Sequence, residues 1–482
     1  MTMKLGASAT LAEDGGAARI AGSDVRLEGA DLHTVVAGRV ARFRSAGIGA
    51  GDRVMVHGDN SVAYVVTLLA LMHLDASIVL VDHRQTRTET EDALTRVNAR
   101  WLLHDGATAP VDLGSGRTLR YDVDGPAPPV AEKISLVAWG ARSDAVILWS
   151  SGTTGPAKGV VKSGHSVFVN CRQTIRAMGY RPDDVLAPWL PFSHQYGLSL
   201  VLIWWLTGCG LTLSDYRRID RALADVRRCG VTMVDATPST YHTLVNLIRR
   251  RPEAVAELGS VRAWGVGGAP LSGMLGDAFL ATVGSPLLDG YGLTEVGNVA
   301  LATPEHPRAC GRPLPGVEVR IRADSGRLAA PGSLGEVEVR SPGLMTGYLS
   351  DDGRVTPPPD DWYQTHDLGM LDAEGNLQVI GRKHAVHRHG YTLYPASIEK
   401  RAERCGQPVK VLAIENERSG ARLAFVVADP EGRPTRHWRE QLCAVLAAYE
   451  HPNSVLVVPE YPVNGNGKID MAALRTIVQP DD

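Results

Sequence analysis

Residues 150–159 combine the residue types that bind phosphate groups. Their sequence, SSGTTGPAKG, follows the apolar run AVILW, so we expect a strand to lead directly into this segment. Glycines let backbone N–H groups turn toward an anion, hydroxyl groups add donors, and Lys158 adds a positive charge. The spacing of a Walker A loop is absent. The segment therefore predicts a phosphate grip, with an ordinary Ser/Gly turn as the alternative. The residues expected to bind are Ser150, Ser151, Gly152, Thr153, Thr154, Gly155 and Lys158.

Further motifs stand in a fixed order along nearly the whole chain. They are GDRV at 51–54, DGYGLTE at 289–295, GRPLPG at 311–316, GE at 335–336, GY at 347–348, YQTHD at 363–367, GR at 381–382 and PVNGNGK at 462–468. With the phosphate segment, they resemble the adenylate-forming superfamily, which includes acyl-CoA synthetases, peptide-synthetase adenylation domains and luciferases. The resemblance implies an AMP-forming ligase that uses ATP and Mg²⁺. Its substrate carboxylate attacks the α-phosphorus, pyrophosphate leaves, and a nucleophile then takes the acyl group.

Two anions meet in this reaction, so the site needs cations where charge develops. Glu295 is the expected Mg²⁺ ligand, because it is a hard carboxylate beside Thr294 in the motif that resembles the family's adenine and metal motif. A solvated surface glutamate is the alternative. The same resemblance implies that Tyr291 stacks on adenine. The other residues that it implies in nucleotide binding are Asp289, Gly290 and Gly292.

Asp367 and Arg382 are expected to contact the ribose. A carboxylate can accept hydrogen bonds from both ribose hydroxyls, and Arg382 would supply a second contact. His366 stands where the family usually has glycine, so the local turn departs from the family pattern.

Lys468 lies in a loop rich in Gly and Asn near the C-terminus. The resemblance implies that its ammonium bridges the substrate carboxylate and the α-phosphate. Taken without the resemblance, the same segment indicates a solvent-exposed hairpin. Loss of such a charge-stabilising donor should slow adenylation by roughly 10²–10³-fold.

The stretch RKHAVHRHG at residues 382–390 corresponds to the hinge about which family members rotate the small domain. His384 stands nearest the usual hinge position, but the stretch is one residue short. Its three histidines allow a metal site as an alternative to a solvated basic hinge.

Selectivity for the acid is expected at His194, Asp235, Gly267 and Gly268. Peptide-synthetase adenylation domains usually carry an aspartate near position 194 that pairs with the α-ammonium of an amino acid. The histidine here makes an ordinary α-amino acid less favoured than an aryl, acyl or non-standard amino acid. Asp235 follows the apolar run VTMV, and we predict that it pairs with an amino or hydroxyl group of the substrate. Capping of the following helix is the alternative.

The expected acceptor is a thiol, either of CoA or of phosphopantetheine on an acyl carrier protein in trans. Transfer to an amine or another non-thiol nucleophile in natural-product biosynthesis is one alternative. A non-catalytic binding protein that retains the fold is another, but Lys158, Glu295, Asp367 and Lys468 all argue against it.

The elements that must position these residues indicate an α/β fold. Short β-branched runs at 52–57, 76–81, 145–149 and 231–235 alternate with helical patterns such as 61–74, which is typical of parallel sheets covered by helices. After residue 316, apolar and polar residues alternate in VEVRIRA and GEVEVRS, which predicts a smaller β-rich unit. We predict a large N-terminal domain at 1–381 and a small α+β domain at 382–482, with strands VKVLAIE and RLAFVVA and a helix at 437–449.

The composition of the chain indicates how many domains to expect, which partners are disfavoured and in which compartment the protein works. The chain has 482 residues, more than one hydrophobic core usually serves, and 44% are hydrophobic and 21% charged. A net charge of −3 without long basic runs gives no indication of nucleic acid or an anionic membrane as a partner. Six scattered cysteines and a polar N-terminal segment predict a cytoplasmic enzyme with reduced thiols.

Overall fold

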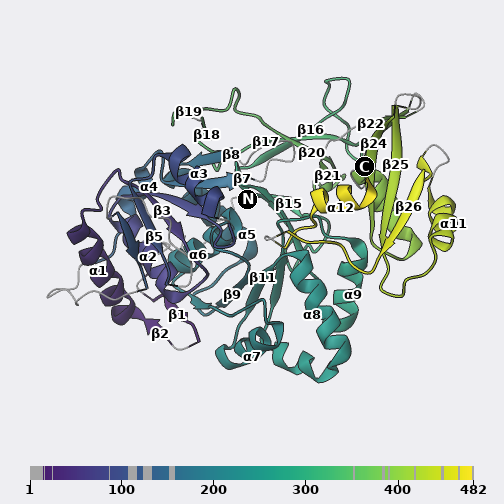
Figure 1. The fold of residues 1–482 in the computed structure, drawn as a ribbon. Coiled ribbons are helices and arrows are strands. Elements are labelled where there is room, and N and C mark those ends of the chain that lie inside the picture. Colours follow the sequence, from purple (N-terminus) through teal and green to yellow (C-terminus); the bar gives the residue numbers. More distant parts are fainter. Residues whose placement is uncertain are drawn as a thin grey trace, which may run out of the picture.

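The computed structural model describes residues 15, 17–23, 25–85, 87–106, 117–122, 133–150, 158–350, 353–382, 386–388, 391–416, 420–446, 450–464 and 467–479. It confirms the predicted α/β class, with a large N-terminal domain and a small C-terminal domain (Figure 1). The exact boundary between residues 381 and 382 stays a prediction.

An eight-stranded sheet carries the first half of the large domain. β3 to β7 are mutually parallel, whereas β8, β18 and β19 extend one edge in antiparallel fashion. In sheet order the strands are β19 (Val355–Thr356), β18 (Gly347–Leu349), β8 (Lys158–Lys162), β7 (Val146–Ser150), β4 (Ser77–Val81), β3 (Arg53–His57), β5 (Trp101–His104) and β6 (Thr118–Arg120).

A nine-stranded sheet carries the second half of this domain. Its central strands β9 to β13 are parallel, and β14, β15 and β2 pair in antiparallel fashion at the two edges. In sheet order the strands are β15 (Arg312–Pro313), β14 (Gly297–Leu301), β13 (Leu288–Leu293), β12 (Ala263–Val266), β11 (Met233–Ala236), β9 (Val185–Trp189), β10 (Gly210–Thr212), β1 (Arg19–Ala21) and β2 (Arg26–Glu28).

Helices cover both faces of both sheets. Those of the large domain are α1 (Gly29–Ala46), α2 (Val62–His73), α3 (Arg87–Val97), α4 (Val137–Ala141), α5 (Gly164–Met178), α6 (Gln195–Thr207), α7 (Ile219–Cys229), α8 (Pro238–Arg250), η1 (Pro252–Leu258) and α9 (Gly273–Val283). α2, α5 and α6 contribute to one core between the two sheets, α7 to α9 cover the far face of the nine-stranded sheet, and α3 covers the far face of the other.

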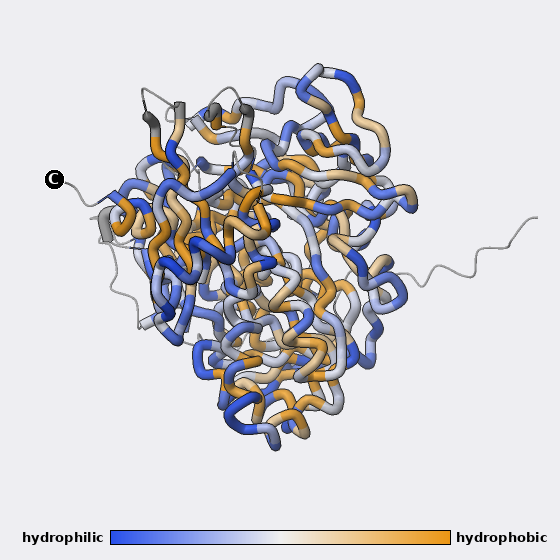
Figure 2. Tube along the Cα trace, turned by 90° about the vertical axis from the view of Figure 1, so that its right-hand side faces the viewer, coloured by the Kyte–Doolittle hydropathy of each residue, from blue (hydrophilic) through white to orange (hydrophobic). Residues whose placement is uncertain are grey.

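Successive side chains of a strand point to opposite faces of its sheet, so they join different cores. Val54 and Val56 of β3 join the core between the sheets, whereas Met55 joins the outer core under α3. α6 is buried on all sides, as expected for a helix without a polar face. In the hydropathy-coloured tube, apolar segments are concentrated in the middle of the molecule, and many of the polar segments lie along its outline (Figure 2).

The β-rich unit predicted after residue 316 is confirmed as a four-stranded antiparallel sheet. Its strands are β16 (Glu318–Arg322), β17 (Gly335–Arg340), β20 (Tyr363–Leu371) and β21 (Leu377–Arg382). Between β17 and β20 the register shifts, so residues 365–367 bulge opposite Val337. A bulge of this kind redirects the side chains that it carries.

The small domain packs a three-stranded sheet against helices around its own core. Its elements are β22 (Val386–Arg388), β23 (Tyr391–Leu393), α10 (Pro395–Ala402), η2 (Glu403–Cys405), β24 (Val409–Asn416), β25 (Gly420–Ala428), α11 (Thr435–Val445), β26 (Ser454–Val458) and α12 (Met471–Val478). The sequence analysis missed β26 and α12. α12 has only eight residues and buries Leu474 against Leu412 and Val426, so its pattern is short.

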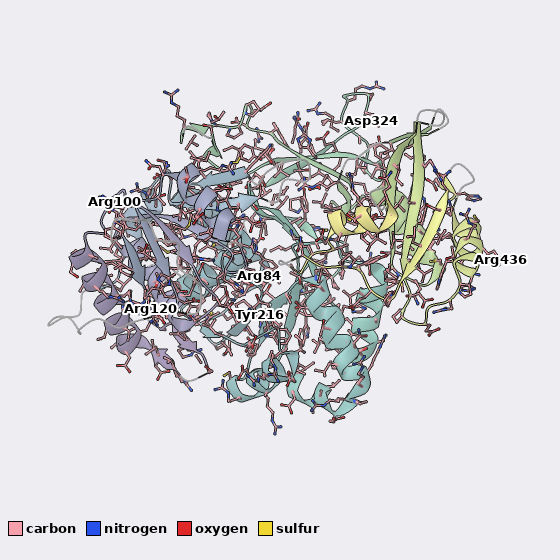
Figure 3. All side chains as sticks on the ribbon, in the orientation of Figure 1. Arg84, Arg100, Arg120, Tyr216, Asp324 and Arg436 are labelled. Atoms are coloured by element: carbon pink, nitrogen blue, oxygen red, sulfur yellow. The ribbon has the colours of Figure 1, made fainter. Side chains whose placement is uncertain are left out.

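The two domains touch through a polar contact. The Tyr394 hydroxyl, just before α10, donates to the Asp324 carboxylate in the loop after β16 at 2.5 Å. Asp324 is labelled beside the small domain in Figure 3.

Candidate active site

The two ends of the phosphate segment lie side by side on adjacent antiparallel strands. Ser150 ends β7 and pairs with Lys158, which begins β8. The Lys158 ammonium lies over the Tyr348 ring, with Nζ 5.2 Å from the ring centroid. The predicted binding residues between these ends lie outside the described residues; they are Ser151, Gly152, Thr153, Thr154 and Gly155.

Glu295 lies in the turn between β13 and β14 and is buried, with 8% of its surface exposed. Its Oε1 accepts a hydrogen bond from the Tyr348 hydroxyl at 2.9 Å, and that hydroxyl is 2.8 Å from the Tyr363 hydroxyl. Tyr348 therefore links Glu295 to Lys158, whose side chain lies over the same ring. The alternative of a solvated surface glutamate does not agree with this burial.

Lys162 is a buried lysine that the sequence analysis missed. Its ammonium donates to the Thr294 carbonyl at 3.3 Å and to the Gly343 carbonyl at 2.8 Å, and its side chain is fully buried. Burial lowers the pKa of Lys162 to about 7, against the opposing effect of the Glu295 charge. Lys162 thus fastens the turn that carries Thr294 and Glu295. A lysine at the end of a β-branched strand resembles an ordinary surface residue, so only its packing distinguishes it.

The DGYG motif forms most of β13. Burial raises the pKa of Asp289 to about 6, and the Cys310 thiol donates to its carboxylate at 3.4 Å. Tyr291 is also buried, and its hydroxyl donates to Asp367 Oδ2 at 2.6 Å. β13 and β20 therefore meet at this hydrogen bond. Gly290 and Gly292 pack closely against β14, since a Cβ on either would lie 2.7 Å from Leu301 or the Gly297 carbonyl, respectively.

The bulge in β20 places Asp367. The Thr365 hydroxyl donates to the Val337 carbonyl at 2.7 Å and accepts from the Asp367 N–H at 3.1 Å. Arg382 approaches the Asp367 carboxylate at 3.3 Å and donates to the Thr365 carbonyl at 2.8 Å. Burial raises the pKa of Asp367, and Arg382 opposes that rise.

His366 has a left-handed backbone, with φ of +58°. Glycine adopts this conformation without steric cost, which explains the glycine expected at this position. The His366 ring lies against Glu336, with its Nδ1 3.1 Å from Glu336 Oε1.

Lys468 reaches the large domain from the small one. Its loop is a hairpin in which the Asn464 N–H donates to the Lys468 carbonyl at 2.7 Å. A Cβ placed on Gly467 would lie 3.2 Å from the Ser239 hydroxyl, at the start of α8. Burial, and then the charge of Arg382, lowers the pKa of Lys468. Val463 also pairs with Ile469, as the two ends of a hairpin would, while residues 465 and 466 lie outside the described residues. Lys468 is half-buried near Arg382 rather than fully exposed.

His194 precedes α6 and faces the carboxyl end of β4. Its Nε2 lies 3.4 Å from Asp82 Oδ2, and Arg84, labelled in Figure 3, donates to both oxygens of the same carboxylate at 2.9 and 2.8 Å. Burial works to raise the pKa of Asp82, but the hydrogen bonds from His194 and Arg84 outweigh it and lower the pKa well below its usual range. The sequence analysis did not single out Asp82, although it directly follows the apolar strand SIVLV.

The other predicted selectivity residues lie at the carboxyl ends of β11 and β12. Gly267 and Gly268 follow β12, and the φ of +80° at Gly268 lies in the left-handed region that favours glycine. Asp235 lies inside β11, whereas Thr237 is the residue that precedes α8. Helix capping by Asp235 is therefore wrong, because its carboxylate instead accepts from the Tyr196 hydroxyl at 2.7 Å.

The predictions of a hinge and of a metal site concern residues that the structure describes only in part. His384 lies outside them, so the hinge stays a prediction. Among the residues that are described, no three His, Cys, Asp or Glu side chains gather as a metal-binding group. Mg²⁺ commonly needs only one or two protein carboxylates besides substrate phosphates, and the buried Glu295 carboxylate fits that demand.

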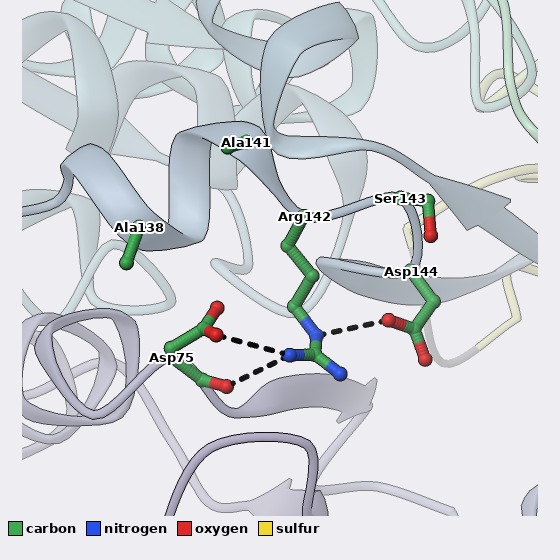
Figure 4. A pocket seen from close by; sticks show the side chains of 6 residues that line it. All are labelled: Asp75, Ala138, Ala141, Arg142, Ser143 and Asp144. Atoms are coloured by element: carbon green, nitrogen blue, oxygen red, sulfur yellow. Dashed lines mark hydrogen bonds and ion pairs between the residues drawn. The ribbon is translucent and has the colours of Figure 1, made fainter.

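A pocket of about 390 Å³ opens elsewhere on the large domain (Figure 4). None of the residues predicted to bind substrate or to take part in catalysis lines it. There Arg142 pairs with Asp75 at 3.3 Å and with Asp144 at 2.9 Å. Its guanidinium is thus already neutralised by protein carboxylates. In the described part of the chain, no helix combines the length and the apolar character needed to cross a bilayer.

A model of the AMP-binding enzyme family matches residues 11–349, the larger part of the chain. The chain belongs to this family. The resemblance stated from its motifs is therefore confirmed, and so is the prediction that it is an enzyme of the AMP-forming ligase type.

This AMP-binding enzyme is 28% identical to a feruloyl-CoA synthase of an Amycolatopsis species, over 91% of its own length and 92% of the relative. Among solved structures, it superposes on ATP-bound MatB from Rhodopseudomonas palustris with a TM-score of 0.83 and 23% identity, covering 96% of both chains. It also superposes on the amide bond synthetase McbA from Marinactinospora thermotolerans with a TM-score of 0.81 and 25% identity, covering 96% of this chain and 97% of that one.

Proposed function

We propose that this enzyme activates a carboxylic acid with ATP as an acyl adenylate, releases pyrophosphate, and transfers the acyl group to a thiol. The acid is an aryl, acyl or non-standard amino acid. CoA is the thiol that the feruloyl-CoA synthase relative favours. Phosphopantetheine on a carrier protein in trans is the second thiol acceptor.

The observation that carries this proposal is the position of Lys468. The small domain delivers the Lys468 ammonium to the region of Arg382, which pairs with the Asp367 carboxylate on β20, and Gly467 lies beside Ser239 of the large domain. A site that joins two anions needs such positive charges, placed where charge develops in the transition state. Burial makes each of these charges more effective than it would be in water.

In the proposed mechanism, the Asp367 carboxylate accepts hydrogen bonds from the ribose hydroxyls, and the Tyr291 ring packs against the adenine. The Tyr291–Asp367 hydrogen bond would orient both residues before the nucleotide binds. Ser150, Lys158 and the loop between them hold the β- and γ-phosphates. Lys468 then brings the acid's carboxylate against the α-phosphate and stabilises the charge that develops during in-line attack.

Glu295 would hold Mg²⁺, with Thr294 beside it. The ion would neutralise charge on the phosphate oxygens. Lys162 and Tyr348 would keep the turn and the carboxylate in place through the contacts described above.

After adenylation, we propose that the domain of residues 382–482 turns about the hinge near His384 and opens a path for the thiol. Before that rotation, Gly467 lies beside Ser239 at the start of α8, and this position of the residue next to Lys468 supports an adenylation arrangement.

Pyrophosphate exchange tests the first half of the proposal. The wild type should exchange labelled pyrophosphate into ATP only in the presence of a suitable acid, and Lys468→Met should lose roughly 10²–10³-fold of that rate. Arg436→Ala is the matched control, because this side chain is 90% exposed on α11. A Lys468→Met enzyme as fast as the wild type would refute the assigned role of Lys468.

The acceptor is tested by mass spectrometry. Enzyme, ATP and an accepted acid are incubated with CoA, with a holo-carrier protein, or with an amine. A thioester supports the proposal. The structural likeness to an amide bond synthetase favours an amine as the second candidate acceptor. If an amide is the only product, the acceptor is an amine and not the proposed thiol.

A further inference from the structure

Asp235 places a carboxylate inside the apolar layer between the two large sheets. On β11, Val234 and Ala236 pack under the helices of the outer face, whereas Met233 faces the core between the sheets. Because side chains alternate along a strand, Asp235 shares the inner face with Met233. Only 5% of its surface is exposed.

This carboxylate has a neutral hydrogen-bond partner. The Tyr196 hydroxyl on α6 donates to Oδ1 at 2.7 Å. Within the described part of the chain, no Lys, Arg or His side chain pairs with Asp235. Its neighbour Gly265, directly opposite on β12, must lack a side chain, because a Cβ there would collide with Oδ1. The carboxylate thus occupies space that the adjacent strand leaves open.

The electrostatic effect of this burial is large. Burial raises the pKa of Asp235 to about 6, and the Tyr196 hydrogen bond opposes the rise. Burial, followed by the charge of Asp235, raises the pKa of Tyr196 and of Tyr241. A buried charge without a paired cation destabilises the fold, and an apolar side chain in its place would not carry this cost. The arrangement has a functional explanation if a ligand supplies a further donor.

The position of Asp235 also suits contact with the substrate acid. β11 ends at Ala236, and Ser239 three residues later lies beside Gly467, next to Lys468. A Cβ on Gly267, at the end of β12, would lie 3.0 Å from the Tyr196 ring. The Asp235–Tyr196 pair therefore lies directly beneath the strand ends where Lys468 arrives.

We propose that Asp235 binds a hydrogen-bond donor, an ammonium or a hydroxyl group, on the part of the substrate acid remote from its carboxylate. This inference rests on the proposed adenylation. In the absence of the acid, the Tyr196 hydroxyl satisfies one oxygen of Asp235. The acid's donor joins it at the carboxylate or takes its place. The substrate class is thus amino- or hydroxy-substituted acids, and isosteres that lack the donor are disfavoured.

Matched acid pairs test the inference by pyrophosphate exchange. 3-Amino-3-phenylpropanoate is compared with 3-phenylpropanoate, and 4-hydroxycinnamate with cinnamate. The readout is the ratio of kcat/KM within each pair. The wild type should prefer one donor-bearing acid at least tenfold, and the pair in which it does so distinguishes an ammonium from a hydroxyl group.

Three variants separate recognition from structure. Asp235→Asn should reduce the preference at least tenfold. Tyr196→Phe keeps the carboxylate and should retain the preference, whereas a merely structural Asp–Tyr pair would make the two variants behave alike. Asp220→Asn removes one charge on α7, where Asp220 is 48% exposed, and should leave the ratio unchanged.

The outcomes also separate the two proposals. If the wild type exchanges pyrophosphate with these acids but shows no donor preference, or if Asp235→Asn keeps the preference, the inference is overturned and adenylation stands. If no acid supports exchange, the proposed function fails, and the inference fails with it.

Discussion

Asp235→Asn should make the enzyme more stable at alkaline pH. The pKa of this carboxyl rises from 3.8 to about 6 in the fold because of burial. A shift of roughly two pKa units corresponds to about 3 kcal/mol between the two protonation states. The folded protein binds this proton more tightly than the unfolded chain does, so the ionised carboxylate destabilises the fold at pH values above about 6.

The sign of the pH dependence follows from that difference. As pH rises from about 4 to about 6, the wild type should lose stability at this site, whereas the variant has no such titration. The asparagine of the variant would still accept the Tyr196 hydrogen bond through its amide oxygen. We therefore expect the variant to gain about 3 kcal/mol at pH 8 and only about 1 kcal/mol at pH 4.5.

Urea denaturation of both proteins at the two pH values measures this difference. Comparing wild type with variant at each pH removes the contributions of all other titrating groups. A stability difference that is the same at both pH values would refute the reasoning, as would a variant that is less stable at pH 8. If the Asp235→Asn variant gains stability but no longer discriminates between the acids, the wild type retains a destabilising buried carboxylate for its function.

Three further predictions concern the residues that hold the site in place. Lys162→Met should destabilise the protein by about 1–3 kcal/mol and raise the KM for ATP, because the Thr294 carbonyl loses its buried donor; thermal unfolding and ATP titration measure the two effects. His366→Val should lose about 1–2 kcal/mol, since a β-branched residue fits the left-handed backbone poorly, whereas His366→Gly should stay within about 1 kcal/mol of the wild type in the same unfolding assay. Asp82→Asn weakens the contact to His194 and should raise the KM for the acid by up to about tenfold while sparing that for ATP, as steady-state kinetics would show.

The pattern of strands and helices was predictable where it was long and regular. Residues 52–57 and 76–81 became β3 and β4, and residues 61–74 became α2, because β-branched runs and a continuous apolar face leave few alternatives. The short elements β26 and α12 escaped, since their formation depends on packing against β24 and β25 more than on local sequence.

Some residues of the candidate site were predictable from the sequence, and others were not. Glu295, Asp367 and Lys468 stand in motifs with recognisable residue types and order, so sequence alone singled them out. Lys162 and Asp82 stand at strand ends, where a lysine or an aspartate is usually solvated, so their local sequence does not distinguish them from surface residues. Their importance follows from long-range partners, Thr294 in one case and His194 in the other.

The sequence by itself indicated the chemistry of this enzyme: the residue types of the segment at 150–159, of the DGYGLTE motif and of the loop around Lys468 suit one reaction, and the order of the motifs identifies the family. Tertiary structure decided which side chains meet. It bent β20 so that Asp367 reaches Tyr291 and Arg382, and it brought the Lys468 hairpin to α8. It also showed that Asp235 lies in an apolar layer, where no described cation pairs with it. Burial and charge pairing are properties of residues far apart in the chain, so no local pattern could reveal them.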